Sequence, residues 1–269
     1  MMPSSLRERA VAVLLAPSPA DKMALTLDAA AAWKAGGMDI GTAEPPARPA
    51  RPERPPLMLP RDMPKRSVGG PQGRVALLHA LAHIELNAID LAWDLIARFG
   101  AVPFPTGFFD DWVQVAADEA AHFRLLANRL ADFGAAYGDL PAHDGLWQAA
   151  EITAGDPLAR LAVVPMVLEA RGLDVTPATI ARFEKLGDGH SASLLQRILD
   201  DEVTHVASGR RWFQWLCAQG GLDPETAYQD RVRRFFRGVL KAPFNREARD
   251  RAGLPSSYYL PLAESSRSA

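Results

Sequence analysis

The sequence has little cysteine and little net charge, and each shortage excludes a class of protein. Cys217 is the single cysteine in 269 residues, which rules out an intramolecular disulfide, a four-cysteine zinc site and an iron–sulfur cluster held by this chain's cysteines alone. A reducing cytoplasm fits such a chain best. The chain has 30 Lys and Arg against 32 Asp and Glu, so its net charge is close to zero. No overall electrostatic attraction to nucleic acid or to anionic lipid is therefore expected.

Long apolar runs and strand patterns are missing as well. No stretch approaches the roughly 20 apolar residues that span a bilayer, so no membrane partner is expected. A short apolar run at residues 10–16 follows two arginines and could imitate a secretion signal, but an amphipathic helix explains it better. Alternating β patterns and Asn-Gly hairpin turns are absent, so no sheet is expected. With 48% hydrophobic residues, the chain is predicted to be an all-α globular protein.

Proline and glycine divide the chain into four segments. These are an N-terminal helical segment (residues 1–37), a Pro/Arg-rich extended strap (38–72), a segment of four long helices (73–220) and a C-terminal helix with a tail (221–269). The first segment is expected to form two helices, split at Pro17, with Ser18 capping the second. In the strap, nine prolines recur between Pro45 and Pro71, which forbids a regular helix or a central strand.

The four long helices follow from apolar residues at helical spacing. The patterns cover residues 74–99, 106–137, 158–173 and 191–219. Pro165 lies inside the third pattern and is expected to disturb that helix. Thr176-Pro177 predicts the start of a further short helix that ends near Gly187. Another helix is expected between Pro224 and Leu240.

Two of the four long helices carry the same motif, Asp-Glu-x-x-His. The copies are Asp118-Glu119-Ala120-Ala121-His122 and Asp201-Glu202-Val203-Thr204-His205. A Glu and a His three positions apart project from one helix face, so both can reach one metal ion. At this composition, two of six His residues would have such a Glu by chance in roughly 3% of cases.

The motif residues and two further carboxylates lie within apolar helix faces. Glu85 interrupts an apolar stripe in residues 78–96, and Glu169 interrupts one in residues 162–173. A buried carboxylate without a partner is costly, so a compensating cation is expected. The alternative, a bundle with buried salt bridges and coincidental histidines, requires Arg or Lys on the matching stripes. None lies on the stripes of residues 74–99 or 106–137 near these carboxylates.

The spacing of the carboxylates agrees with a site for two metals. Neither Glu85 nor Glu169 has a His three positions later, and a dinuclear bundle site requires one Glu from each of two helices and Glu-x-x-His from the other two. Glu85 and Glu119 are 34 positions apart, and Glu169 and Glu202 are 33 apart. The 50 positions between Glu119 and Glu169 leave room for one long crossover.

These residues resemble the ferritin-like di-iron or di-manganese proteins. More narrowly, the chain is similar to a bacterial ferritin-like family catalogued as domain of unknown function 455. The resemblance rests on His83-Ile-Glu-Leu-Asn-Ala-Ile-Asp-Leu91, Asp118-Glu-Ala-Ala-His-Phe123, Leu168-Glu-Ala-Arg-Gly-Leu-Asp174, Asp201-Glu-Val-Thr-His205 and Lys241-Ala-Pro-Phe-Asn245. A more distant likeness is to the di-iron tRNA hydroxylase. The resemblance implies a ferritin-like four-helix bundle with one long crossover.

The resemblance also implies a role for each candidate ligand. Glu119 and Glu202 would bridge two metal ions, Glu85 and Glu169 would be terminal ligands, and His122 and His205 would each bind one ion. Carboxylate and imidazole ligands suit iron, with manganese as the alternative.

Three functions are compatible with this site. The leading hypothesis is an oxidoreductase in which the metal pair activates dioxygen or peroxide to oxidise an organic substrate, either a small molecule or a modified nucleoside, with a separate electron donor. The first alternative is metal handling, meaning ferroxidase activity, storage or peroxide scavenging. The second is a structural bundle whose metal is inert or absent.

Other polar residues have simpler interpretations. His79 and His83 share a face with Asn87, Asp90 and Asp94, which predicts a polar stripe on the outside of the helix.

Asp118 and Asp201 are either hydrogen-bond acceptors for a ligand His or exposed helical residues. Arg171 either pairs with a ligand carboxylate, contacts an anionic substrate or is solvated. The arginines of residues 231–237 are expected to form a solvated face with no strong nucleic-acid signal, and Trp212, Phe213 and Trp215 are expected in the core.

Overall fold

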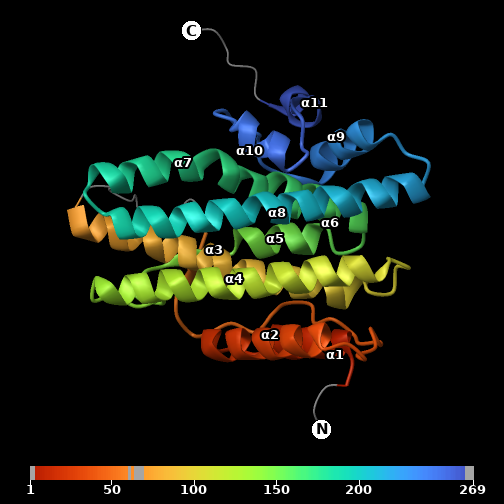
Figure 1. The fold of residues 1–269 in the computed structure, drawn as a ribbon, viewed down its shortest axis with the longest axis horizontal. Helices are drawn as coiled ribbons and strands as arrows, with labels where there is room; N and C mark the ends of the chain where they lie inside the picture. The colour runs from red at the N-terminus through yellow and green to blue at the C-terminus, as the bar shows by residue number, and fades with distance from the viewer. Residues whose placement is uncertain (1–3, 60–61, 64–69, 264–269) are drawn as a thin grey trace. The chain divides into compact units, whose positions relative to one another are not determined.

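The computed structural model describes residues 4–59, 62–63 and 70–263. The chain divides into two compact units, Met1–Gln148 and Ala149–Ala269. The predicted all-α class is confirmed, since helices make up almost all the regular structure (Figure 1).

In its described residues, the first unit holds four helices and two short strands. They are α1 (Leu6–Leu15), α2 (Pro19–Lys34), β1 (Leu57–Met58), α3 (Gly70–Phe99), α4 (Thr106–Asp132) and β2 (Ala142–His143). The helix α5 (Gly145–Ile152) contains the division between the units.

Apart from an isolated β-bridge between Leu240 and Ala263, the regular structure of the second unit is helical in the residues that are described. Its elements are α6 (Pro157–Val163), the π-helical turn η2 (Val164–Glu169), α7 (Ala170–Lys185), α8 (Gly189–Gln219), α9 (Pro224–Phe235), α10 (Arg246–Arg251), α11 (Ser256–Tyr259) and the 3-10 turn η3 (Leu260–Leu262).

The two N-terminal helices form where the sequence predicts them. Ser5 and Glu8 make a capping box at the start of α1, and the Ser18 side chain accepts a hydrogen bond from the Asp21 amide at the start of α2. The α1 helix packs on α3, and α2 packs on α4. The apolar run after the first arginines thus supplies the buried face of α1, with Ala10, Val13 and Leu14 fully buried.

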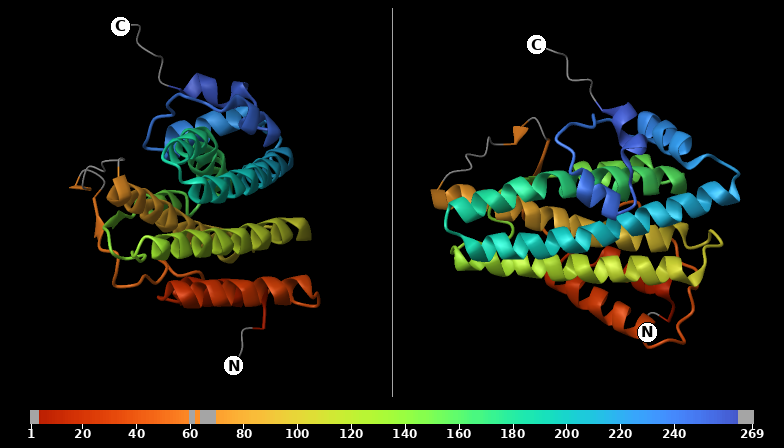
Figure 2. Two further views of the ribbon diagram at one scale, coloured as in Figure 1. Left: turned by 60° about the vertical axis from the view of Figure 1, so that its left-hand side comes forward. Right: turned by 45° about the horizontal axis from the view of Figure 1, so that its top comes forward.

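The α3 and α4 helices of the first unit pack along each other (Figures 1 and 2). The α4 helix ends at Asp132, five residues before the predicted end at Tyr137. The physical reason is Gly134, whose φ of 70° is left-handed and cannot continue a helix.

One helix, α3, is long and apolar enough to span a membrane, contrary to the prediction that no stretch comes close. However, 67% of its most apolar stretch is buried inside the protein. Such burial is typical of the core helix of a soluble protein. Its apolar residues are explained by its packing against α1 and α4.

The prediction that the chain has no sheet is wrong in one place. β1 and β2 pair in parallel, with Leu57 opposite Ala142 and Met58 opposite His143. Each strand has two residues, too few to show an alternating pattern, and the pairing joins segments far apart in sequence.

In the second unit, Pro165 and Pro177 have different effects. Pro165 lies in η2, so the predicted disturbance of this helix is confirmed. Pro177 was expected to begin a new helix, and this expectation is wrong because α7 runs through it. Proline removes the donor for the carbonyl of Leu173, and the Asn245 side chain donates to that carbonyl instead, at 3.1 Å.

Candidate metal centre

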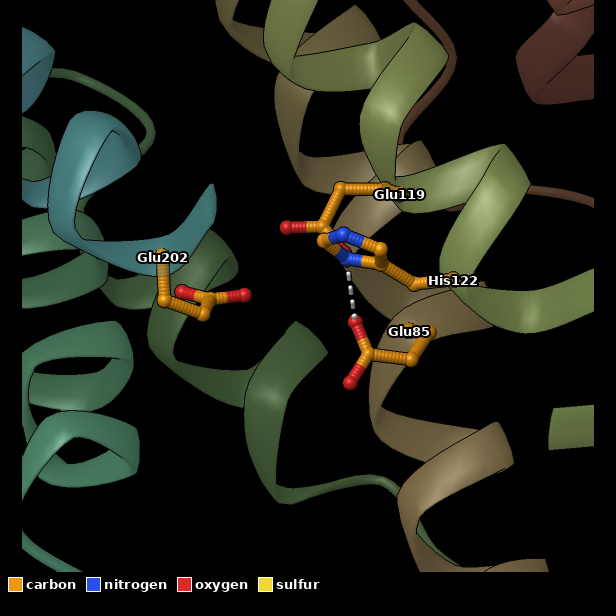
Figure 3. Close-up of side chains that lie close together, drawn as sticks. All are labelled: Glu85, Glu119, His122 and Glu202. Atoms are coloured by element: carbon orange, nitrogen blue, oxygen red, sulfur yellow. Dashed lines mark ion pairs between the residues drawn. The ribbon is translucent and has the colours of Figure 1, made fainter. Parts of the chain in front are cut away.

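In the first unit, α3 and α4 bring three of the predicted ligands together. Glu85 comes from α3, and Glu119 and His122 come from successive turns of α4. His122 Nδ1 lies 3.6 Å from Glu85 Oε2 and 3.5 Å from Glu119 Oε2 (Figure 3). Glu85 is 4% exposed and the other two are 0% exposed. The three residues offer ligand atoms within 4.8 Å of one another and could hold a metal ion.

The electrostatics of this cluster are those of crowded, buried acids. Burial raises the pKa of Glu85 well above its usual value, and the negative charge of Glu119 raises it further. Burial alone would lower the pKa of His122, but its contacts with Glu119 and Glu85 raise it to about 11. In the protein without metal, a proton bound to these groups therefore neutralises part of the negative charge that a metal cation would neutralise.

The second unit repeats the Glu-His pair on α8. Glu202 and His205 are both buried, and His205 Nδ1 lies 3.6 Å from Glu202 Oε1. Glu202 is also drawn in Figure 3. Glu169 is half-buried and is the last residue of η2. The metal-binding role of all six residues stays a prediction.

A close contact between α8 and η2 fixes the position of the π-helical turn. A Cβ atom on Gly209 would lie only 2.4 Å from Cβ of Pro165, so only glycine permits this approach. The Tyr228 hydroxyl donates to the carbonyl of Met166 inside the turn, at 3.2 Å. Turns of this kind are frequent at functional sites, and this one ends at a predicted ligand, Glu169.

The predicted outer stripe of α3 is wrong, because its five residues are buried. His79, His83, Asn87, Asp90 and Asp94 are between 0% and 5% exposed. They are covered by α2, by the strap and by the segment after α4, which the periodicity of α3 alone could not reveal.

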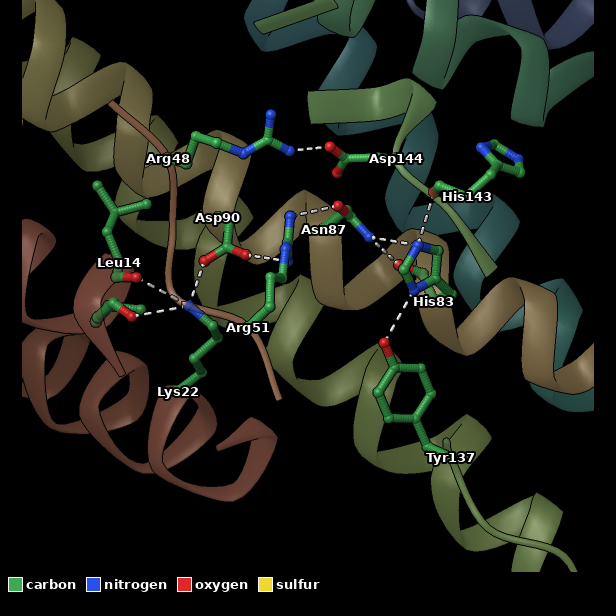
Figure 4. A network of polar contacts seen from close by, with 11 residues as sticks. Leu14, Lys22, Arg48, Arg51, His83, Asn87, Asp90, Tyr137, His143 and Asp144 are labelled. Atoms are coloured by element: carbon green, nitrogen blue, oxygen red, sulfur yellow. Dashed lines mark hydrogen bonds and ion pairs between the residues drawn. The ribbon is translucent and has the colours of Figure 1, made fainter. Parts of the chain in front are cut away.

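This stripe is the centre of a polar network that the sequence analysis missed (Figure 4). Asp90 accepts from Lys22 of α2 at 2.7 Å and from Arg51 of the strap at 2.5 Å. Arg51 also donates to Asn87 at 2.6 Å. The network could have been predicted from the opposite charges of the arginine-rich strap and the acidic stripe of α3.

His83 lies at the other end of this network. Its Nδ1 is 2.9 Å from the Tyr137 hydroxyl, and its Nε2 is 3.0 Å from the carbonyl of His143. Burial lowers the pKa of His83 to about 4, so the ring is neutral near pH 7. A neutral, fully engaged imidazole explains its place in the interior without any metal.

Arg171 is partly solvated, with 41% of its side chain exposed, and its contacts within the second unit are with groups other than the predicted ligands. Its guanidinium donates to the carbonyls of Lys241 and Pro243 and lies 3.5 Å from Asp174. It therefore fastens the segment after α9 to α7.

The tail arginines and the aromatic residues of α8 agree with expectation only in part. Arg233, Arg234 and Arg237 are exposed, but Arg231 is half-buried and pairs with Asp156 and Asp230. Trp212 and Phe213 are buried in the core, whereas Trp215 is only half-buried. Gln114 donates to Asp118, and the choice between the two roles proposed for Asp118 stays open.

Comparisons with known proteins match nearly the whole chain. The sequence profile of the family described as "Protein of unknown function (DUF455)" matches residues 15–260. An uncharacterized protein of Haemophilus influenzae is 41% identical over 209 residues, which cover 76% of this chain and 73% of the relative. No solved structure matches.

Proposed function

The chain belongs to the DUF455 family, and from this premise we propose that it is a dinuclear metal oxidoreductase. In this proposal the metal is iron, and dioxygen or peroxide oxidises an organic substrate. The site has six ligands, Glu85, Glu119, His122, Glu169, Glu202 and His205.

One observation carries the proposal: two buried carboxylates and an imidazole gather in the first unit. Burial raises the pKa of Glu85, and repulsion from the neighbouring Glu119 raises it further. A divalent cation would remove this repulsion and stabilise the ionised carboxylates. Carboxylate oxygens and imidazole nitrogen together are donors that suit iron or manganese.

The second set supports two ions rather than one. The α8 helix repeats the Glu-His pair of α4, and Glu169 on η2 corresponds to Glu85 on α3 in chain order. We propose that the two sets face each other in a ferritin-like four-helix bundle, with Glu119 and Glu202 shared between the ions.

The chain's own residues would hold and shield the ions. The carboxylates and imidazoles fix the positions of the ligand atoms, and the apolar residues around them exclude water. Iron bound there would supply the electron transfer that dioxygen or peroxide chemistry needs. The substrate in this proposal is a small molecule or a modified nucleoside, the electron donor is a separate protein, and the compartment is the cytoplasm.

Elemental analysis tests the site. The full chain, produced with iron supplied, should contain two metal ions per chain, the number for a dinuclear site. Glu119→Ala, in the first unit, and Glu202→Ala, in the second, should each lose both ions. Glu184→Gln, at an exposed position of α7, is the matched control and should keep them. Loss from only one unit's variants would contradict a shared site, and a metal-free parent protein would remove the site altogether.

Two further measurements separate the reactions. Adding dioxygen to the reduced, iron-loaded protein should change its absorption spectrum if the site is redox-active, whereas a structural metal would leave the spectrum unchanged. Gel filtration then tests metal storage, because a mass near that of a many-subunit shell would contradict a substrate-oxidising enzyme.

A further inference from the structure

A cavity of about 140 Å³ lies within the second unit, and its lining residues do not include the predicted ligands there. It is formed by the end of η2, the first turns of α7, the segment after α9 and α10. None of the chemistry proposed above uses it.

Most of the cavity wall is apolar and partly aromatic. Its apolar side chains are Val167, Leu168, Phe236, Val239, Leu240 and Phe244. Val239 is 47% exposed, so part of this wall is open to solvent. Cavities of about 150 Å³ with apolar walls accept one benzene-sized ring. The cavity therefore fits a single ring and little more.

The charged part of the wall is positive. Arg171, Lys241 and Arg249 line the cavity together with one acid, Asp174. Arg249 holds Asp174 through two hydrogen bonds, Nε to Oδ1 at 2.8 Å and Nη2 to Oδ2 at 2.7 Å. That pair is electrically neutral, so Arg171 and Lys241 leave an excess of positive charge beside an apolar wall.

Arg249 also has a hydrogen-bond donor, Nη1, that is buried. Its side chain is 2% exposed, and its buried Nη1 donates no hydrogen bond to any part of the chain that the structure describes. A buried donor without an acceptor is costly, and an anionic ligand would supply one.

We propose that this cavity binds a small organic anion with one apolar ring, an aromatic carboxylate in its simplest form. The ring would lie against the apolar wall, and the carboxylate would accept from Arg249 and face Lys241 and Arg171. Val167 and Leu168 directly precede Glu169, and Arg249 donates to the carbonyl of Ala170, at 3.3 Å. A bound anion would thus touch the turn that carries a predicted ligand, but its binding does not depend on the metal.

Calorimetric titration of the full-length protein with benzoate tests the proposal. Benzoate should bind roughly tenfold or more tightly than benzyl alcohol, which keeps the ring and lacks the charge. Benzylamine, with the opposite charge, should not bind, and inorganic phosphate should bind more weakly than benzoate. Equal affinity for benzoate and benzyl alcohol, or no binding of either, would overturn the proposal.

Single substitutions locate the binding. Lys241→Gln should weaken benzoate binding about three- to tenfold and leave benzyl alcohol unchanged. Lys185→Gln, an exposed lysine at the end of α7 outside the cavity, is the matched control. Val239→Trp, at a half-exposed position, should fill the cavity and abolish binding of both ligands. Identical affinities for the Lys241 and Lys185 variants would contradict the site.

The Glu119→Ala variant separates this proposal from the metal proposal. Benzoate should bind this variant as it binds the parent protein, whether or not the parent contains metal. Loss of benzoate binding in Glu119→Ala would place the anion at the metal centre instead and overturn the cavity assignment.

Discussion

The two helix pairs that carry the buried carboxylates are supported by different forces. In the first unit, α3 and α4 are regular helices. Asp90 of α3 forms ion pairs with Lys22 of α2 and Arg51 of the strap, and these pairs hold α3 in place. In the second unit, the turn that carries Glu169 is irregular, and it is held by the close contact of Pro165 with Gly209 and by the hydrogen bond from Tyr228 to Met166. One chemical motif therefore depends on buried ion pairs in the first unit and on a close steric contact with one hydrogen bond in the second.

This difference predicts which perturbations each unit will resist. A buried ion pair loses its stabilising effect when one partner is removed or when a neighbouring group titrates. A close steric contact is instead disrupted when an atom is added. Hydrogen exchange, which reports local opening helix by helix, can assign each loss of stability to one unit.

The largest effect is expected from Asp90→Asn. The change leaves Lys22 and Arg51 without their shared counter-charge, and Lys22 is fully buried, so the free energy of unfolding should fall by about 3–5 kcal/mol. Exchange protection should be lost in α2 and α3 and kept in α8. Asp132→Asn removes a half-exposed partner of Arg129 and should cost less than about 1 kcal/mol. Equal effects of the two changes would show that the network does not support α3.

The next effect is a loss of stability in acid that comes from His83. Its pKa is about 4 in the folded protein and near 6.5 unfolded, so unfolding takes up a proton between these values. Stability should therefore fall as the pH drops from 6.5 to about 4, by up to about 3 kcal/mol. Urea denaturation at a series of pH values measures this slope. His83→Gln should flatten it, and an unchanged slope in that variant would assign the acid sensitivity to other groups.

A smaller effect is expected from Gly209→Ala in the second unit. The added methyl group would overlap Pro165 and should lower the free energy of unfolding by about 1–3 kcal/mol. Protection should fall in η2 and α8, while α3 should keep its protection. If the protection of η2 were unchanged, the contact would not hold the turn in place.

The smallest effect has the opposite sign. Gly172 lies inside α7, and a Cβ atom there would meet nothing within 4 Å. Gly172→Ala should therefore raise the free energy of unfolding by about 0.5–1 kcal/mol, because alanine loses less backbone entropy in a helix. Thermal unfolding measures the gain, and a loss of stability would mean that glycine is required at position 172.

Much of the helical structure could be predicted from the sequence, because helices depend on local spacing and capping. Ser18 marked the start of α2, and Pro165 marked the irregular turn. Errors arose where distant segments meet. Pro177 stays inside α7 because Asn245, far along the chain, donates to the carbonyl that proline leaves without a donor. The two short strands pair across more than 80 residues and have no local signal.

The sequence by itself determined the all-α class and the repeated Glu-x-x-His motif, because both depend on residues within a few helical turns of one another. Only the tertiary structure decided that Glu85 lies beside Glu119 and His122, and that the polar stripe of α3 is buried. Helical periodicity separates the faces of a helix, but it cannot say what covers each face. The polar face of α3 is covered by Lys22 and Arg51, which come from segments distant in sequence. Their positive charges offset the cost of burying Asp90.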